Sequence, residues 1–370
     1  MKIMLEKKDL TPVVSSAARG ASNNDIMPIL KGMMLEAKEG KLIATALDLE
    51  VGIKVSTSEV QLDEEGCVLV NAKNFNDLVA KLPDEVITLQ TKDNRLEVKY
   101  GRSRCHLKTL DTASWSGWPD REYREKFVIP QEKLKTALQH TIFACAKEHF
   151  RNIFKGVLID VQPEAGEIRF VGTDTHRMAY YRCPIENLAE PFNVVIPAKA
   201  AGELTRHLMG PDPINIGMNG NNIIFSSDDF EMYSRTIDGQ YPNYLQVIPK
   251  DASQYIEFNP EELRGCVERI NALPRDDKKN IMPIKFKCGE ELIVTGTSEE
   301  AGEIKETCSL VTSLKKDDSL DIAFNITYVY DALKTMPDKC KLSFSGEISP
   351  AILQSSPEYL MVLVPLRMAG

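Results

Sequence analysis

Acid, base and hydroxyl side chains that could act together occur in one short run, Thr173-Asp174-Thr175-His176-Arg177. A carboxylate, an imidazole and a hydroxyl are the groups that general acid–base catalysis uses. Asp174 and His176 lie two residues apart at the expected end of a strand, and no partner nucleophile is indicated. Three interpretations follow: a catalytic site, a turn that Asp174 stabilises, and the polar rim of an apolar groove that binds a peptide.

The sequence lacks the other common signatures of catalysis and of cofactor binding. It has no GxxxxGK[ST] phosphate loop, no GxGxxG after a strand, no HExxH and no GxSxG. The eight cysteines form no CxxC pair, and the five histidines are scattered. We therefore expect no metal, no cofactor and no disulfide framework, and reduced, mostly buried thiols instead.

The elements that must position these residues recur three times along the 370-residue chain. Each copy reads helix, strands, helix, strands over roughly 120 residues, which is a typical domain size. Thr45, Thr173 and Thr295 occupy matching strand positions in the three copies. Asn259 and Pro260 make a good helix start in the third copy, and Pro130 takes the first helical position in the second. The expected helices span residues 6–20, 72–82, 131–147, 198–208, 260–275 and 325–336.

Charge is distributed unevenly over these elements. The chain as a whole carries a net charge of −9, which excludes a strongly cationic nucleic-acid binder but allows a local basic surface. The six helix segments together carry +5, so the remainder carries −14. The helices therefore either present ordinary solvated faces or line a surface that faces a polyanion through sparse, sequence-independent phosphate contacts.

Two strand-like segments carry opposite charge. "GRSRCHLK" holds Arg102 and Arg104, and "SEEAGEIKE" holds Glu299, Glu300 and Glu303. Exposed strand edges invite pairing, and a basic edge with an acidic one suits head-to-tail assembly into a closed ring. The alternative is that the charges only protect each edge against aggregation.

The end of the sequence also points to a groove. "YLMVLVPLRM" is apolar almost to the last residue, so it must be docked as a strand, and Pro365 then ends the pairing near a surface. The absence of an 18-residue apolar run predicts no transmembrane helix, and the charged residues 6–8 predict no signal peptide. We expect a cytoplasmic protein.

The three-fold repeat, "VGTDTHRMA", "RTIDGQYPNYLQVIP" and the terminal "YLMVLVPLRM" together resemble the bacterial DNA polymerase III beta subunit family over essentially the whole chain. The resemblance implies an α+β fold with three clamp domains, at residues 1–122, 123–250 and 251–370. Each domain would have two helices backed by antiparallel sheets. Two chains would join head to tail into a six-domain ring, with helices lining the hole.

The family also implies three sets of site residues. A peptide-binding groove between the second and third domains would contain Phe154, Thr173, Thr175, His176, Arg177, Met178, Pro242, Gln246, Val247, Val362, Leu363, Val364, Pro365, Leu366 and Arg367. Candidates to face DNA are Lys73, Lys81, Lys147, Arg151, Lys199 and Arg206. The ring joint would involve Arg102, Arg104, Cys105 and Leu107 on one chain, and Ile270, Leu273, Glu299, Glu300 and Glu303 on the other.

These implications predict a non-catalytic, homodimeric sliding clamp associated with the bacterial replisome. It would encircle double-stranded DNA and tether the replicative polymerase, with the clamp loader and repair proteins binding through short linear peptides. A loader ATPase must open the ring, because the chain has no nucleotide site of its own. Two competing hypotheses remain at this point: an enzyme that uses Asp174, His176 and Arg177, and a monomeric three-domain scaffold that binds peptides without encircling DNA.

Overall fold

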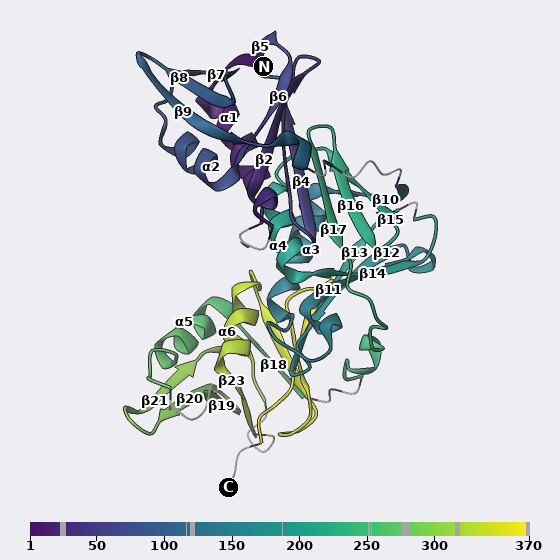
Figure 1. The fold of residues 1–370 in the computed structure, drawn as a ribbon. Helices are drawn as coiled ribbons and strands as arrows, with labels where there is room; N and C mark the ends of the chain where they lie inside the picture. The colour runs from purple at the N-terminus through teal and green to yellow at the C-terminus, as the bar shows by residue number, and fades with distance from the viewer. Residues whose placement is uncertain are drawn as a thin grey trace. The chain divides into compact units, whose positions relative to one another are not determined.

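The computed structural model describes residues 1–22, 27–115, 117–118, 123–186, 188–250, 252, 254–275, 282–314 and 319–367. The predicted domain borders at residues 122 and 251 lie outside these ranges. The contacts divide the chain into two compact units, Met1–Leu134 with Glu203–Thr236, and Lys135–Gly202 with Ile237–Gly370. Each unit is built on antiparallel sheets (Figure 1). Among the described residues, no helix is long and apolar enough to span a membrane.

A 13-stranded sheet forms the first unit, in the order β10-β15-β16-β17-β4-β3-β2-β6-β9-β8-β7-β1-β5. Helices α1 and α2 pack against each other, and α1 covers β3 and β4. Their strands and helices are β1 (Lys2–Glu6), α1 (Lys7–Ala18), β2 (Gly32–Lys38), β3 (Lys41–Leu47), β4 (Val51–Thr57), β5 (Gln61–Glu64), β6 (Gly66–Asn71), α2 (Ala72–Lys81), β7 (Val86–Lys92), β8 (Arg95–Tyr100), β9 (Ser103–Leu110), β10 (Arg124–Pro130), β15 (Pro213–Asn219), β16 (Asn222–Ser227) and β17 (Phe230–Arg235).

The second unit holds a nine-stranded sheet, β14-β11-β12-β13-β26-β25-β24-β18-β22, and a four-stranded one, β21-β20-β19-β23. Helices α5 and α6 pack side by side (Figure 1). The elements are β11 (Gly156–Gln162), β12 (Glu167–Thr173), β13 (Arg177–Pro184), β14 (Phe192–Pro197), β18 (Gln254–Phe258), α5 (Pro260–Ile270), β19 (Pro283–Cys288), β20 (Leu292–Ser298), β21 (Gly302–Cys308), β22 (Leu310–Thr312), β23 (Leu320–Asn325), α6 (Ile326–Lys334), β24 (Cys340–Phe344), β25 (Ala351–Gln354) and β26 (Tyr359–Leu363).

Helices α3 (Gln131–Gln139) and α4 (Ala198–His207) each contribute residues to both units. Short 3₁₀ turns connect several elements: η1 (Pro28–Lys31), η2 (Thr112–Ser114), η3 (Ile142–Ala144), η4 (Asn152–Lys155), η5 (Pro163–Ala165) and η6 (Tyr244–Gln246).

Amphipathic spacing and caps explain the helices. In α2, Ala72, Phe75 and Val79 form the buried face, and the Asn71 side chain accepts a hydrogen bond from the backbone N–H of Asn74. In α5, the Asn259 side chain accepts from the N–H of Glu261, and Pro260 is the first helical residue, as the sequence predicts.

The second copy departs from the predicted helix over residues 131–147. Pro130 is the last residue of β10 and pairs with Pro213, so it does not take the first helical position; the helix begins at Gln131. It also ends early, at Gln139, because the Thr141 hydroxyl donates to the carbonyl of Ala137 and competes with the continuing helix. Lys147 consequently lies in a loop and not on a helix.

The burial of the cysteines agrees with the prediction of mostly buried thiols. All eight are free thiols, and six of them are buried, the exceptions being exposed Cys67 and half-buried Cys105. Burial raises the pKa of the Cys145 thiol to about 12, so this sulfur stays protonated and unreactive.

Candidate functional site

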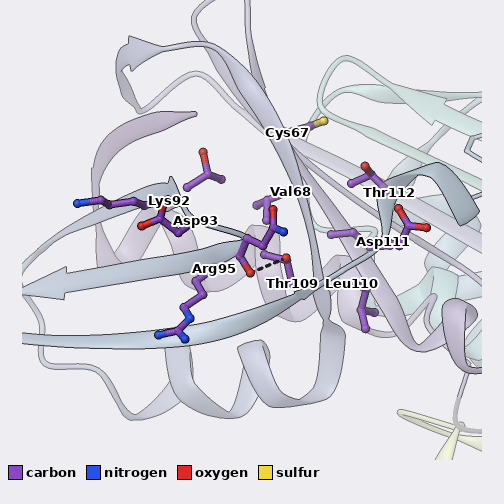
Figure 2. Close-up of a pocket in the computed structure, with 12 residues that line it drawn as sticks. Cys67, Val68, Lys92, Asp93, Arg95, Thr109, Leu110, Asp111 and Thr112 are labelled. Atoms are coloured by element: carbon purple, nitrogen blue, oxygen red, sulfur yellow. Dashed lines mark hydrogen bonds between the residues drawn. The ribbon is translucent and has the colours of Figure 1, made fainter.

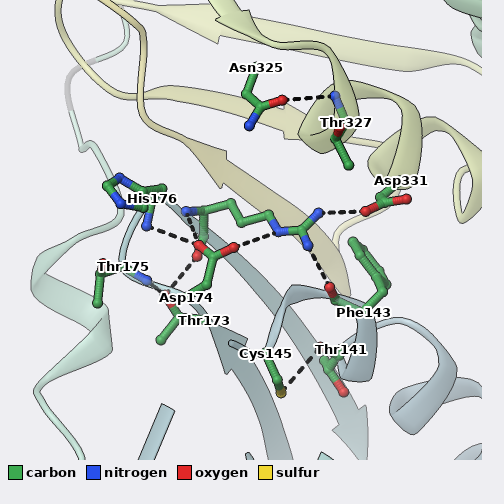
Figure 3. Close-up of polar contacts among 11 residues, drawn as sticks. Thr141, Phe143, Cys145, Thr173, Asp174, Thr175, His176, Asn325, Thr327 and Asp331 are labelled. Carbon is green, nitrogen blue, oxygen red and sulfur yellow. Dashed lines mark hydrogen bonds and ion pairs between the residues drawn. The ribbon is translucent and has the colours of Figure 1, made fainter. Parts of the chain in front are cut away.

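The sequence run Thr173-Asp174-Thr175-His176-Arg177 forms a tight turn between β12 and β13 (Figure 3). One carboxylate oxygen of Asp174 accepts the backbone N–H groups of His176 and Arg177, each at 3.0 Å. The Thr173 hydroxyl donates to the Arg177 carbonyl at 2.6 Å and accepts from the N–H of Thr175 at 3.1 Å. Thr175 has a φ of 77°, a left-handed conformation that is strained for a β-branched residue.

Arg177 ties this turn to two other elements of the second unit. Its guanidinium donates to the second Asp174 oxygen at 3.1 Å, to Asp331 of α6 at 2.8 Å and to the carbonyl of Phe143 in η3 at 2.7 Å. The side chain is only 8% exposed and lies 4.5 Å from the centre of the Tyr328 ring. A buried cation with three charge-assisted or carbonyl partners and an aromatic face is fully satisfied, so Arg177 fixes the turn in place.

This arrangement does not support acid–base chemistry. Both oxygens of Asp174 are occupied by the turn and by Arg177, and it is the backbone N–H of His176 that reaches the carboxylate. In Figure 3 the His176 ring points away from Asp174. The pair therefore lacks the carboxylate–imidazole contact that would orient a general base.

An apolar floor lies beside the turn. Met178 pairs with Val362 across β13 and β26, and both are buried in one cluster with Phe154. The backbone N–H of Val364 donates to the carbonyl of His176 at 3.0 Å, so the chain end stays attached after β26 stops at Leu363. The apolar C-terminal segment is therefore docked as a strand, as predicted, and it is docked inside the sheet between β13 and β25.

The remaining predicted groove residues lie around η6 and along the chain after β26, and they differ in exposure. The N–H of Leu366 donates to the carbonyl of Ala323 at 2.7 Å, which places the chain end against β23. Pro242, Gln246 and Val247 are exposed on the segment around η6, next to buried Tyr244. Leu363 is buried in the larger core, whereas Val364 and Arg367 are exposed and Pro365 is half-buried. The structure thus brings predicted groove residues from β12, β13, β26 and η4 together.

Sequence reasoning missed several residues that build this site. Tyr244 donates its hydroxyl to Asp160 at 2.6 Å, and burial, together with that carboxylate, raises the Tyr244 pKa. Phe143, Tyr328 and Asp331 hold Arg177. Only long-range packing reveals them, because they lie 34 to 154 residues from Arg177 with no local motif.

The basic candidates are exposed but do not form one continuous helix face. Lys73 and Lys81 lie on the solvent side of α2, and Lys199 and Arg206 are exposed on α4. Arg206 pairs with Glu203 at 2.6 Å, and the carboxylate offsets part of the positive potential around the guanidinium. Lys147 and Arg151 are exposed in the loop between η3 and η4.

Two cavities lie in the first unit. One, of about 790 Å³, collects Lys73 with Arg19 and Lys31, together with asparagine and serine side chains from α1 and α2. A polar cavity with cations from three elements suits phosphate, and Arg19 and Lys31 were not among the predicted residues. The other, of about 670 Å³, lies where β6 and β9 part and contains none of the predicted site residues; its lining includes Cys67, Lys92, Arg95 and Asp111 (Figure 2).

The two charged segments each run from a turn into a strand: Arg102 lies in the turn before β9, and Glu299 and Glu300 lie in the turn before β21. Among the described strands, residues 103–108 of β9 pair with β8 alone, because β6 joins β9 at Leu110 and Thr109. Strand β21 is the outer strand of its sheet. On β9 the exposed Arg104 alternates with half-buried Cys105 and Leu107, so the edge offers charge on one face and apolar surface on the other.

At the acidic edge the structure contradicts the prediction for one residue, Ile270. Ile270 has no exposed surface because it is packed in the core of its own unit, so it cannot touch a partner directly. Half-buried Leu273 and Ile304 supply the accessible apolar surface there instead. Glu299, Glu300 and Glu303 are exposed. Glu306 is held by Arg269 at 2.7 Å, and hydrogen bonding by that guanidinium lowers the Glu306 pKa.

Comparison with known proteins assigns the three segments of the chain to one protein family. Three family models match consecutive segments, namely the DNA polymerase III beta subunit N-terminal domain at residues 1–117, the central domain at 128–243 and the C-terminal domain at 245–368. The chain belongs to the DNA polymerase III beta subunit family. Its three clamp domains and its role as a processivity clamp follow from this membership.

Curated relatives and solved structures agree with the assignment. The beta sliding clamp of Escherichia coli K12 is 28% identical over 373 residues, with both chains covered completely. That of Bacillus subtilis 168 is 26% identical and covers 99% of this chain and all of the relative. A sliding clamp of Pseudomonas aeruginosa with ligand has a TM-score of 0.88 at 25% identity, and the Thermotoga maritima beta subunit one of 0.89 at 24%; both pairs of chains are covered completely.

Proposed function

We propose that two copies of this beta-subunit chain close head to tail into a six-domain ring that encircles duplex DNA and tethers the replicative polymerase. The observation that carries this proposal is the pair of open strand edges, basic on β9 and acidic beside β21. Unlike edges on one chain make a heterologous joint, which gives a closed ring when the rotation permits. Three domains per chain, at 1–122, 123–250 and 251–370, would give six in the dimer.

In this proposal the ring holds DNA by topology and not by affinity. Tight phosphate contacts would oppose sliding, so an acidic protein with sparse exposed cations such as Lys73, Lys81 and Lys199 fits better than a strongly basic one. Tethering then raises the effective concentration of polymerase at the primer end, which increases processivity without any chemistry by the clamp. The proposal needs no catalytic residue and no cofactor, and it locates the protein with the replisome at the nucleoid.

The groove formed by the turn after β12, by β26 and by η6 would bind short linear peptides from the polymerase, the clamp loader and repair proteins. Two observations support this role. The buried apolar cluster around Met178 and Val362 forms the floor beside the turn, and the locked turn presents the exposed His176 ring at the rim. Apolar pockets that supply affinity, with polar rims that set orientation, are common in peptide recognition.

Negative-stain electron microscopy of the full chain at micromolar concentration tests the proposed assembly. Closed two-fold rings with six lobes and a central hole are expected. Three-lobed crescents at every concentration, with no rings when loader and DNA are added, would refute the ring and favour the monomeric scaffold. Binding of peptides to such crescents would show that the groove stands independently of the ring.

A further inference from the structure

Phe150 is the most exposed large hydrophobic side chain in the part of the chain that the structure describes. It is 89% exposed, in the loop between η3 and η4. An aromatic ring left in water gains considerable free energy when a partner covers it, and such rings are over-represented among the residues that dominate binding. The site residues inferred above do not account for Phe150.

The ring of Phe150 is supported from below. It stacks on His149 with the ring centres 4.5 Å apart and an interplanar angle of 27°. His149 in turn packs edge-on against Phe154 at 4.9 Å, and Phe154 packs against Tyr241 at 6.2 Å. The Nδ1 atom of His149 accepts the backbone N–H of Arg151 at 3.0 Å, which fixes the imidazole in the loop. Phe150 is therefore the outer end of a continuous row of aromatic rings.

The inner end of this row lies in the proposed groove. Phe154 is buried in the same apolar cluster as Met178 and Val362. The Arg151 guanidinium lies 5.6 Å from the centre of the Phe154 ring, and Lys147 is exposed three residues before Phe150 in the sequence. The loop thus holds two cations, Lys147 and Arg151, against one carboxylate, Glu148.

We propose that Phe150 extends the peptide groove and binds an aromatic or large aliphatic side chain that flanks the partner's groove-anchoring residues, next to an acidic residue that Lys147 or Arg151 attracts. This inference rests on the proposed peptide-binding function. Continuity of the aromatic row with the groove favours a peptide. An exposed ring among cations can also stack on an unpaired nucleobase, and that alternative is separated by the test.

The test uses dodecapeptides selected from a random phage library on the full-length wild-type chain, then synthesised with a fluorophore. Their affinities are measured by fluorescence anisotropy for Phe150→Ala, Phe150→Trp, His149→Ala and Met178→Ala. Leu49→Ala is the matched control, because Leu49 is 71% exposed and lies in the first unit. Binding of a 20-residue oligothymidylate is measured in parallel with each variant.

The expected result is a loss of about tenfold with Phe150→Ala for peptides that carry a flanking aromatic or aliphatic residue, and none for peptides that lack it. Phe150→Trp should retain binding, and His149→Ala should lose about threefold because the ring loses its support. Equal affinities of Phe150→Ala and Leu49→Ala for all peptides would overturn the proposal, while sensitivity to Met178→Ala would preserve the groove.

Two further outcomes also count against the proposal. If Phe150→Ala weakens oligothymidylate binding and leaves every peptide unchanged, the loop is a nucleobase platform. If no selected peptide responds to Met178→Ala, the groove itself is wrongly placed, and the extension fails with it.

Discussion

Individual side chains in the second unit do different work although they are adjacent in sequence. The side chains of Asp174 and Arg177 form hydrogen bonds that hold the turn. His176 is exposed at its rim, and Met178 is buried in the apolar cluster. The strain at Thr175, with its φ of 77°, lies in this same turn. Strained backbone is retained where the surrounding contacts over-determine it, here through Asp174 and Arg177.

Replacing Met178 with alanine tests the groove floor directly. The change deletes part of the apolar surface shared with Phe154 and Val362, so we expect peptide affinity to fall by roughly tenfold or more. Ring formation should be unaffected, because Met178 is remote in sequence and sheet order from β9 and β21. Anisotropy with the selected peptides and sedimentation velocity measure the two properties separately. Unchanged peptide affinity in a folded variant would show that the groove lies elsewhere.

Replacing Thr175 with glycine tests the strain in the turn. Glycine adopts positive φ without the clash that a β-branched side chain suffers, so the folded state should gain about 1 kcal/mol, reduced by the greater freedom of glycine in the unfolded chain. Thermal unfolding monitored by circular dichroism should show a higher midpoint. Thr297→Gly, in the regular strand β20, is the control and should lower it. A lower midpoint for Thr175→Gly would mean that the hydroxyl or methyl of Thr175 contributes more than the strain costs.

Acid stability should depend on His207 in α4. Burial, reinforced by Arg19, lowers its pKa to about 4; Arg206 acts in the same direction and Glu203 opposes them. The unfolded chain, with an ordinary histidine pKa near 6.5, binds a proton that the folded chain refuses between pH 6.5 and 4. Stability is therefore lost as the pH falls through that window, by on the order of 2 kcal/mol from this residue.

Substitution of His207 with phenylalanine should remove this contribution while keeping the stack on Phe230. Urea unfolding at pH 7 and pH 4.5 measures the effect as a smaller difference between the two midpoints. His140, whose pKa burial also lowers, should add to the pH dependence in the same direction. An unchanged midpoint difference in His207→Phe would show that His207 is protonated in the folded protein.

At the scale of elements, the two open strand edges matter most. The basic edge offers Arg102, in the turn before β9, and Arg104 with half-buried Leu107 on the strand itself. The acidic edge offers Glu299, Glu300 and Glu303 with half-buried Leu273. Pairing of such edges would combine backbone hydrogen bonds, apolar contact and opposite charge, which together give a stable and oriented joint.

Reversing one charge tests this joint. We expect Arg104→Glu to raise the dimer dissociation constant by at least tenfold, since it places an acid opposite an acidic edge. Arg124→Glu is the matched control, because Arg124 is an exposed arginine on another edge strand, β10. Sedimentation equilibrium of both variants gives the constants. If the Arg104→Glu variant and the wild type have equal dimer dissociation constants, the joint does not lie at β9.

The sequence predicted most elements because their signals are local. All six helices occur where apolar spacing and caps placed them, and Asn259 and Pro260 start α5 as expected. The third and fifth helices, predicted to reach residues 147 and 275, end at Gln139 and Ile270. In the third, the competition from Thr141 depends on where its hydroxyl points in the folded chain. Ile270 was assigned to the ring joint from the family resemblance, and a resemblance transfers a residue's position without showing whether its own domain or a partner covers the side chain.

The sequence identified the segments that form the candidate groove, but it did not predict how they contact one another. The motif run Thr173–Met178 and the apolar C-terminal segment were visible, yet their antiparallel register, Met178 against Val362, is a contact between residues far apart in the chain. Asp331, Phe143 and Tyr328 carry no motif and appear only once Arg177 is placed among them. Long-range contacts of this kind follow from packing, which a local pattern does not encode.

At the scale of the whole molecule, a ring that holds DNA by topology should behave differently from a protein that holds DNA by charge. Electrostatic binding falls steeply with salt, and at about 1 M the Debye length is only about 3 Å. A circular plasmid has no end from which a closed ring could slide off, so the ring should stay on the plasmid at that salt concentration. The net charge of −9 makes purely electrostatic retention still less favourable.

Loading the fluorescent chain onto a nicked circular plasmid, with the clamp loader and ATP from the same organism, tests this expectation. After gel filtration at about 1 M salt, most of the loaded protein should elute with the circular plasmid. Cutting the plasmid once with a restriction enzyme should release it, because the ring slides off the ends. Arg104→Glu should not be retained on either DNA, since its ring opens. Loss from the uncut circle at high salt, or retention on the linear form, would contradict encirclement and indicate that contacts rather than topology hold the protein on DNA.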